Sequence, residues 1–191
     1  MKRTHLIVAV LAAALALAGS ARAADYVIDT AKAHASIEFR IKHLGFSWLT
    51  GRFDTFSGTF TFDEANPSAS KVHVEVDTAS INSNHAERDK HLRSKEFLDV
   101  AEFPKAVFDS TSVKLEGDKA AITGNLTLRG ITKPIEIEAQ RVGGGADPWG
   151  GYRDGFSGTT RLALKDFGIN FDLGPNSKEV ELRLNVEGVR Q

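Results

Sequence analysis

Four polar side chains that could bind a ligand or react with it lie close together in the sequence: His85, Arg88, Asp89 and His91. Imidazole and guanidinium groups donate hydrogen bonds to carbonyl or anionic oxygens, and a histidine can also transfer a proton near neutral pH. The group could therefore hold the polar head of a ligand, or act on it as an acid or base. It could equally be a solvated connector whose polar groups cap helix ends.

The spacing of the reactive residues does not favour a metal site or a nucleophilic site. On a helix, His85 and His91 would lie about 240° apart, on different faces. A further ligand would have to come from elsewhere, and His43 is one candidate. The chain has no cysteine, which excludes thiolate zinc sites and cysteine nucleophiles. Gly155-Phe156-Ser157-Gly158 lacks the spacing of a nucleophile elbow, so we predict no metal ligand and no catalytic residue.

The polar residues belong to a segment, 82–104, that the sequence predicts to be a short helical insert. Asn84 and Glu87 have the spacing of an N-terminal capping box. Two acid-to-base pairs stand four residues apart, the favourable arrangement on a helix: Glu87 with His91 and Asp89 with Arg93. Pro104 prevents the helix from continuing. We expect paired charges to fix this insert over the rest of the fold.

The remainder of the chain alternates apolar and polar residues, the pattern of strands with one buried face. The clearest runs are Ile37/Phe39/Ile41, Phe56/Phe60/Phe62, Val72/Val74/Val76, Ile122/Leu126/Leu128 and Val180/Leu182/Leu184. About eight such strands follow one another at hairpin spacing, without the long crossovers of a parallel sheet. We therefore predict an all-β fold, an eight-stranded antiparallel barrel with its apolar side chains inward. Two loops are predicted, at Gly143–Gly151 and Asp166–Asn176.

The N-terminus predicts export. Residues 1–23 have the three parts of a cleaved signal peptide: a basic start at Lys2 and Arg3, an apolar centre from Leu6 to Leu17, and the small-residue pattern Ala21-Arg22-Ala23. The mature chain would then run from 24 to 191 as one domain, in the periplasm.

The charge of the mature chain excludes one class of partner. Without Lys2, Arg3 and Arg22, the 24 basic residues fall to 21, against 25 acidic ones, for a net charge of −4. A protein that binds a phosphate backbone would show a basic stripe, so we expect no nucleic-acid partner.

Four motifs spread along the chain have a specific residue pattern. The longest runs from Asn84-His85 through Arg88-Asp89, His91-Leu92 and Ser94 to Phe97-Leu98. The others are Phe39-Arg40-Ile41-x-His43-Leu44-Gly45, Gly124-x-Leu126-Thr127-Leu128-x-Gly130-x-Thr132-Lys133-Pro134 and Asp147-Pro148-Trp149-Gly150-Gly151. With these motifs the whole mature chain resembles the YceI family, also called UPF0312, of periplasmic isoprenoid-binding proteins.

The resemblance implies an extended, lipocalin-like eight-stranded barrel that holds a long-chain isoprenoid or similar lipid, with no demonstrated enzymatic activity. Six of the 12 phenylalanines lie between Phe39 and Phe62, more rings than a filled core needs, so they could line a ligand cavity. The predicted lumen residues are Ile37, Phe39, Ile41, Phe46, Trp48, Phe53, Phe56, Phe60, Phe62, Val74, Phe97, Phe108, Leu126, Leu128, Leu182 and Leu184. His85, Arg88, Asp89 and His91 are predicted to form a polar mouth.

Two functions from different classes remain open at this point. The first is a carrier or storage protein for a lipid such as a polyprenyl quinone or a related isoprenoid, with no other cofactor. The second is a stress-related protective protein, or an enzyme that uses His85, Arg88 and His91 on a lipid head group. The partner expected in both cases is a small-molecule lipid, and transient membrane contact and a homodimer are left open.

Overall fold

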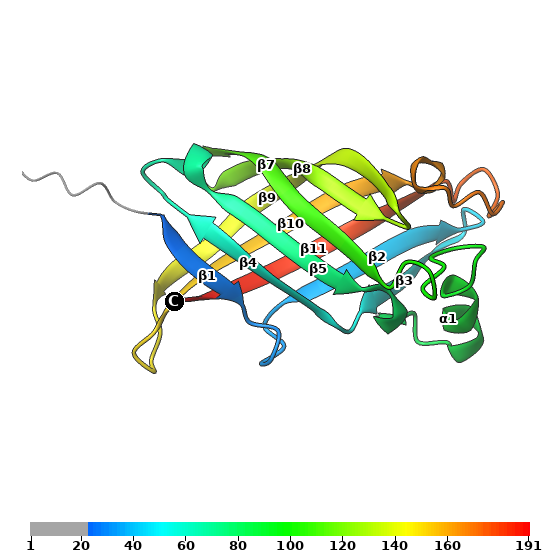
Figure 1. The fold of residues 1–191 in the computed structure, drawn as a ribbon, viewed down its shortest axis with the longest axis horizontal. Helices are drawn as coiled ribbons and strands as arrows, with labels where there is room; N and C mark the ends of the chain where they lie inside the picture. Colours follow the sequence, from blue (N-terminus) through cyan, green and yellow to red (C-terminus); the bar gives the residue numbers. More distant parts are fainter. Residues whose placement is uncertain (1–22) are drawn as a thin grey trace, which may run out of the picture.

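A computed structural model of the protein describes residues 23–191, which form an elongated barrel with a short helix at one end (Figure 1). The predicted signal peptide lies outside the described residues, apart from Ala23. The strands are β1 (Ala24–Ile28), β2 (Ser36–His43), β3 (Ser47–Phe53), β4 (Phe56–Phe62), β5 (Lys71–Asp77), β6 (Ile81–Asn82), β7 (Lys105–Glu116), β8 (Lys119–Leu128), β9 (Ile131–Ala146), β10 (Tyr152–Ala163) and β11 (Glu179–Arg190). The helix is α1 (Ala86–Leu92), and 3-10 turns span Pro67–Ala69, Thr78–Ser80 and Leu164–Phe167.

The strands close into a ring of eight, in the order β1-β4-β5-β7-β8-β9-β10-β11, because β1 also pairs with β11. All neighbours in the ring are antiparallel. Toward the α1 end, β2 takes the place of β1 beside β11, and β3 and β6 continue β4 and β5. The predicted eight-stranded antiparallel barrel is confirmed.

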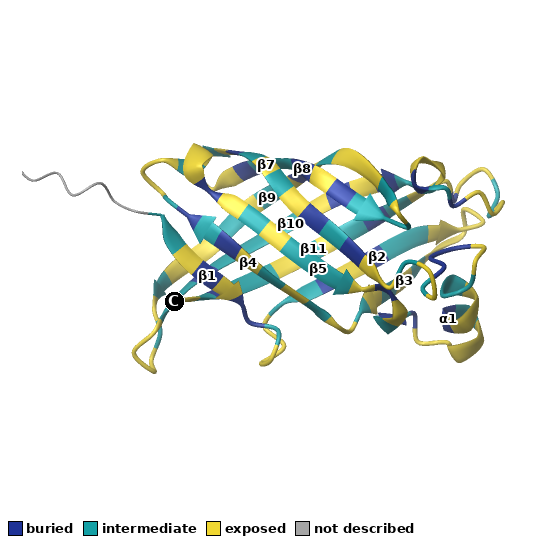
Figure 2. Ribbon diagram, in the orientation of Figure 1, coloured by how far each residue is buried: buried dark blue, intermediate teal, exposed yellow. Residues whose placement is uncertain are grey.

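The alternation of the sequence becomes the inside and outside of the barrel. Exposed residues are interspersed with intermediate ones along β5, and with buried or intermediate ones along β7 (Figure 2). Successive side chains of a strand point to opposite faces, so each apolar run covers the interior and each polar run covers the exterior. The inward residues Val180, Leu182 and Leu184 of β11 are only half-buried, because they face a cavity rather than a filled core.

Two predicted segments differ from the structure. The helical insert is helical only over α1, and its N-cap is His85, whose side chain accepts from the Arg88 N–H, rather than Asn84. Asn84 instead adopts a left-handed conformation, with φ of 62°. The predicted loop Gly143–Gly151 is shorter, because β9 continues to Ala146. Among residues 23–191, no helix has the length and apolar character needed to cross a membrane.

Three phenylalanine rings lie against inward-facing glycines of other strands. Phe39 lies over Gly51, Phe108 over Gly124 and Phe60 over Gly188, each so close that a methyl group on the glycine would overlap the ring. The rings therefore rest against the barrel wall instead of filling its centre. The glycines thus determine how much of the interior stays open.

Replacing Gly51 by alanine is expected to push the Phe39 ring into the interior. Forcing extra volume into this contact should lower the free energy of unfolding by about 1–3 kcal/mol. The matched control is Gly143→Ala on β9, where an added methyl group meets no atom within 4 Å. Urea unfolding of both variants checks the prediction, and equal stabilities would contradict the proposed role of the glycine.

Candidate functional site: a two-part apolar cavity with a polar mouth

The interior of the barrel contains two apolar cavities that adjoin along its axis. The inner cavity, of about 160 Å³, lies toward the chain termini, and the outer one, of about 600 Å³, lies toward α1. Both are lined by Ile37, Val76, Ala106, Leu126 and Leu182, which mark their junction. The outer volume lies within the range of small-molecule sites in proteins.

A buried ion pair closes the inner end of the barrel. Arg141 on β9 donates from Nε to Asp154 Oδ1 (2.9 Å) and from Nη2 to Asp154 Oδ2 (2.8 Å), and the Asp154 side chain is 1% exposed. The Arg141 guanidinium also lies over the Phe62 ring, 5.1 Å from its centroid. The hydrogen bonds to Asp154 raise the pKa of Arg141 above its ordinary value, so the guanidinium keeps its positive charge.

Tyr26, near the same end, is 3% exposed. Burial raises the pKa of its phenol, and the negative charge of Asp154 raises it further. The Tyr26 ring is stacked on Phe60 with 4.7 Å between centroids. The inner end is therefore closed by packed side chains, and we expect a ligand to enter from the α1 end.

Asp89 fixes α1 to the strand that precedes it, through Ser83. The Ser83 backbone N–H (2.8 Å) and its hydroxyl both donate to Asp89 Oδ1. Arg88 donates from Nε to the Ser83 hydroxyl (2.7 Å) and from Nη2 to the Ser83 carbonyl (2.6 Å). Burial would raise the pKa of Asp89, but the hydrogen bonds from Ser83 and the nearby Arg93 and Arg88 outweigh it, so this pKa lies below its ordinary value.

Replacing Asp89 by alanine is expected to lower the free energy of unfolding by about 2 kcal/mol at pH 7, because the buried Ser83 N–H loses a charged acceptor. The folded-state pKa is depressed, so the carboxylate stabilises the fold above its unfolded-state pKa of about 3.9. That contribution is lost as the pH falls through the folded-state value. The difference between wild type and variant should therefore be full at pH 7 and shrink below pH ~4.

Urea unfolding at several pH values measures this difference. Asp109→Ala, which removes an exposed carboxylate on the outer wall beside His73, is the matched control and should have little effect at either pH. A loss for Asp89→Ala that is no larger than the control, or that persists unchanged at pH 3, would contradict the role given to this carboxylate.

The ion pairs predicted within the helix are not formed. Arg93 instead donates to the carbonyls of Ala79 and Ile81, at 2.6 Å each, and His91 pairs with Glu96. A second arginine that the sequence did not single out, Arg129, donates to the carbonyls of Gly168 (2.6 Å) and Lys95 (2.8 Å). These arginines join the loops around the open end into one rim.

The outer cavity has a few polar groups at its mouth. Arg88 and His91 line it, together with Lys42, His43 and Asp172. Arg88 uses Nε and Nη2 for Ser83, and Nη1 has no acceptor among residues 23–191. The His91 ring packs edge-on against Phe97 (4.9 Å) and Phe171 (5.2 Å). The mouth therefore offers cationic hydrogen-bond donors beside aromatic rings.

Most of the predicted lumen residues face one or both cavities. Those that do are Ile37, Phe39, Ile41, Phe53, Phe56, Phe60, Phe62, Val74, Phe97, Phe108, Leu126, Leu128, Leu182 and Leu184. The structure places them around one internal space, and their contact with a ligand stays a prediction.

Two of the predicted lumen residues are wrong. Phe46 lies in the turn between β2 and β3 and is 87% exposed. Trp48 occupies an outward position of β3, where Arg40 lies over its ring at 4.3 Å. On that strand the inward residues are Leu49 and Phe53, which have the other parity.

Of the four residues predicted to form the polar mouth, two line the cavity and two do not. Arg88 and His91 line the outer cavity, whereas His85 caps α1 on its exposed side and Asp89 is buried beneath the helix. The loop residues Ile169, Phe171 and Leu173, which were not predicted from the sequence, complete the wall of the outer cavity. They alternate with Asn170 and Asp172 as the residues of a strand do, but the segment was predicted to be a loop, so this alternation was not used to place them at the cavity.

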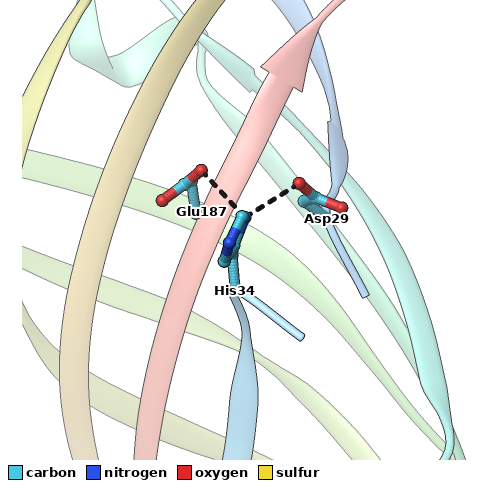
Figure 3. A group of neighbouring side chains, drawn as sticks. All are labelled: Asp29, His34 and Glu187. Atoms are coloured by element: carbon cyan, nitrogen blue, oxygen red, sulfur yellow. Dashed lines mark hydrogen bonds and ion pairs between the residues drawn. The ribbon is translucent and has the colours of Figure 1, made fainter. Parts of the chain in front are cut away.

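Within residues 23–191, side chains able to hold a metal ion come together at one place on the outside of the barrel: Asp29, His34 and Glu187 (Figure 3). His34 Nδ1 lies 3.2 Å from Asp29 Oδ2 and 3.5 Å from Glu187 Oε1. Arg153 already contacts the same two carboxylate oxygens, at 2.8 Å in the case of Asp29, and this contact, together with His34, lowers the pKa of Asp29. The group is therefore an ion-pair cluster rather than an open cation site.

Comparison of the sequence with known proteins finds close relatives of full length. The model of the family described as "YceI-like domain" matches residues 26–188. A "UPF0312 protein" of Pseudomonas aeruginosa (strain LESB58) is 62% identical over 191 residues, the whole of both chains. "Protein YceI" of Salmonella arizonae is 59% identical over 189 residues, 99% of each chain.

Solved structures share the barrel. BcnA of Burkholderia cenocepacia aligns with a TM-score of 0.74 at 21% identity, over 84% of this chain and 98% of BcnA. A "polyisoprenoid binding domain from Saccharophagus degradans implicated in plant cell wall breakdown" aligns with a TM-score of 0.62 at 15% identity, over 89% of this chain and 100% of that domain. At these identities the likeness shows a common fold.

Proposed function

The chain belongs to the YceI-like family, and from this premise we propose that it is a carrier that binds a long-chain isoprenoid or similar amphiphilic lipid inside its barrel. The observation that carries the proposal is the pair of adjoining apolar cavities, packed shut at the inner end and provided with polar groups at the outer end. This shape suits a molecule with a long apolar chain and one polar head.

The cavity walls supply affinity without directional contacts. Each methylene transferred from water to an apolar interior contributes roughly 0.8 kcal/mol, so a long chain could bind tightly through burial alone. The walls are the same for any apolar chain, and selectivity would then come from the length of the cavity and from its mouth. The name of the Saccharophagus domain, which has this fold, supports an isoprenoid as the chain.

The polar head would lie at the mouth, near Arg88, His91 and His43. Arginine and histidine donate hydrogen bonds to carbonyl or anionic oxygens, which suits the head of a polyprenyl quinone or a related lipid. A second function, an enzymatic or protective action on the head group, is favoured by one observation: the ionisable His91 lines the cavity. An enzyme would change the lipid, whereas a carrier would return it unchanged.

Reloading lipid-free protein tests the proposal. Protein unfolded, extracted with organic solvent and refolded is offered a polyprenyl quinone or a long-chain fatty amide, then separated by gel filtration. We expect about one unchanged lipid per chain, and weaker retention by His91→Gln. The matched control is His73→Gln on the outer wall, since the two histidines are 45% and 44% exposed and each is paired with a carboxylate.

Three outcomes are distinguishable in this experiment. Retention of unchanged lipid supports the carrier. A modified lipid that no longer forms with His91→Gln would establish the enzymatic alternative. Protein that takes up neither lipid would leave the carrier proposal without support. The aromatic rings at the cavities would then be ordinary core residues.

The carrier would act in the periplasm, as the signal pattern of residues 1–23 suggests. Sequencing the N-terminus of protein recovered from a periplasmic extract should return Ala24. Protein that retains Met1, or that stays in the cytoplasmic fraction, would contradict this location.

A further inference from the structure

Large apolar side chains are exposed at the open end of the barrel. Leu44 and Phe46 lie in the β2–β3 turn, and Phe171 lies in the loop that follows β10; all three are exposed, Phe46 most of all. Both segments lie at the same end as α1 (Figure 1). Leu44 and Phe171 also line the outer cavity, so the apolar surface continues from the interior over the rim. Apolar surface of this kind marks an interaction site more often than single scattered residues do.

The two segments contact each other and form one surface. A methyl group placed on Gly45 would lie 2.8 Å from the Asn176 side-chain nitrogen, and one on Gly174 would lie 3.9 Å from the Leu44 side chain. We call this surface, made of residues 42–48 and 171–178, the rim patch.

The rim patch contains the cationic side chains Lys42 and Lys178 and is bordered by Arg161. A surface groove of about 480 Å³ beside it is lined by Lys42, Trp48, Arg161 and Lys178, together with Glu179 and Glu181. Glu181 is neutralised by Arg40 at 2.8 Å, Arg183 at 3.3 Å and Arg161 at 3.5 Å. Within residues 23–191, neither Lys42 nor Lys178 has a carboxylate within ion-pair distance. Two carboxylates lie at the mouth: Asp172 lines the cavity, and Glu96 is paired with His91.

Trp48 joins the apolar and cationic parts. Its indole lies beneath the Arg40 guanidinium at 4.3 Å and 5.7 Å from the Lys42 ammonium. An amphipathic indole among cations, beside exposed aliphatic and aromatic side chains, is the composition that binds at the head-group level of an anionic bilayer.

We propose that the rim patch docks the open end of the barrel on a bilayer that contains anionic phospholipids. Phe46 and Leu44 enter the acyl boundary, and Lys42, Lys178 and Arg161 meet the phosphate groups. A lipid chain could then pass between bilayer and cavity along Leu44 and Phe171 without crossing water. This inference extends the proposed function, but vesicle binding and cavity occupancy are separate measurements.

The two tryptophans of the chain allow a direct test, because Trp48 lies at the rim patch and the exposed Trp149 lies in the β9–β10 turn at the opposite end. Vesicles with brominated acyl chains and phosphatidylglycerol should quench Trp48 in the Trp149→Phe variant. They should leave Trp149 unquenched in the Trp48→Phe variant. Vesicles of phosphatidylcholine alone, or high salt, should weaken the effect, because the cations lose their partner.

Phe46→Ser should weaken vesicle affinity by about tenfold, the loss expected for one buried aromatic side chain. The matched control is Val142→Ser, an exposed apolar residue of β9 outside the rim patch, which should bind as wild type does. Quenching of Trp149 equal to that of Trp48, or equal affinities for the two serine variants, would overturn the proposal. So would self-association through this face, seen by light scattering, without vesicle binding.

Mass spectrometry of the same samples separates the two proposals. Protein that docks on vesicles but never contains lipid would contradict the carrier proposal and still support the docking surface. Protein that contains lipid but does not bind vesicles would contradict only the docking proposal.

Discussion

Replacing Ala106 by phenylalanine is expected to abolish retention of long-chain lipids while short-chain ones remain bound. Ala106 is a small residue at the junction of the two cavities, and a phenylalanine ring there would separate them. Excluding about four methylenes from the inner cavity removes roughly 3 kcal/mol, or more than a hundredfold in affinity. A chain short enough for the outer cavity would lose little.

Binding assays with a series of fatty amides of increasing chain length measure this effect. Ala121→Phe is the matched control, because Ala121 lies on β8 outside both cavities. Val76→Phe, from the neighbouring strand and at the same junction, should reproduce the result if Ala106→Phe folds poorly. Equal losses at all chain lengths would mean that the ligand does not extend into the inner cavity.

Replacing Arg141 by methionine is expected to lower the free energy of unfolding by about 3 kcal/mol, because Asp154 keeps a buried charge without its cation. For a chain of this size the melting temperature should fall by about 6–12 °C. The double variant Arg141→Met/Asp154→Leu should recover most of the loss, since apolar residues can replace a buried ion pair at little cost.

The control for this prediction is Lys105→Met, which breaks the exposed Lys105–Glu75 pair on the outer wall and should leave the melting temperature nearly unchanged. Thermal unfolding of the variants measures the effect. A double variant as unstable as the single one, or a control that loses as much as Arg141→Met, would show that the ion pair is not what closes the inner end.

The barrel could be predicted from the sequence because apolar and polar residues alternate with a period of two in almost every strand. The strand from Val180 to Val186 shows this most clearly. The alternation gave no prediction for the β2–β3 turn, and Phe46, assigned to the lumen as one of the clustered aromatic rings, lies in that turn. Trp48 was assigned to the lumen because aromatic rings cluster in this part of the sequence, whereas the period of two counted from Leu49 puts it outside.

The contacts that complete the site depend on tertiary structure and have no signature in the sequence. Arg141 and Asp154 meet because β9 and β10 pair beyond the bulge at Gly155/Phe156, in a region that looked like a glycine-rich loop. Arg129 holds carbonyls from two loops far apart in the chain. Polar residues near His91 could be foreseen, but the Asp89–Ser83–Arg88 link could not, because a serine has many equivalent partners.

The central claim is that a lipid occupies the barrel, and native mass spectrometry of the protein purified without detergent tests it most directly. The account predicts a mass above that of the mature chain by one lipid, with an isoprenoid or long-chain amphiphile recovered from an organic extract. Ala106→Phe should lose that mass and Ala121→Phe should keep it. A spectrum at the bare chain mass for wild-type protein, from cells and after incubation with polyprenyl quinones, would contradict the account.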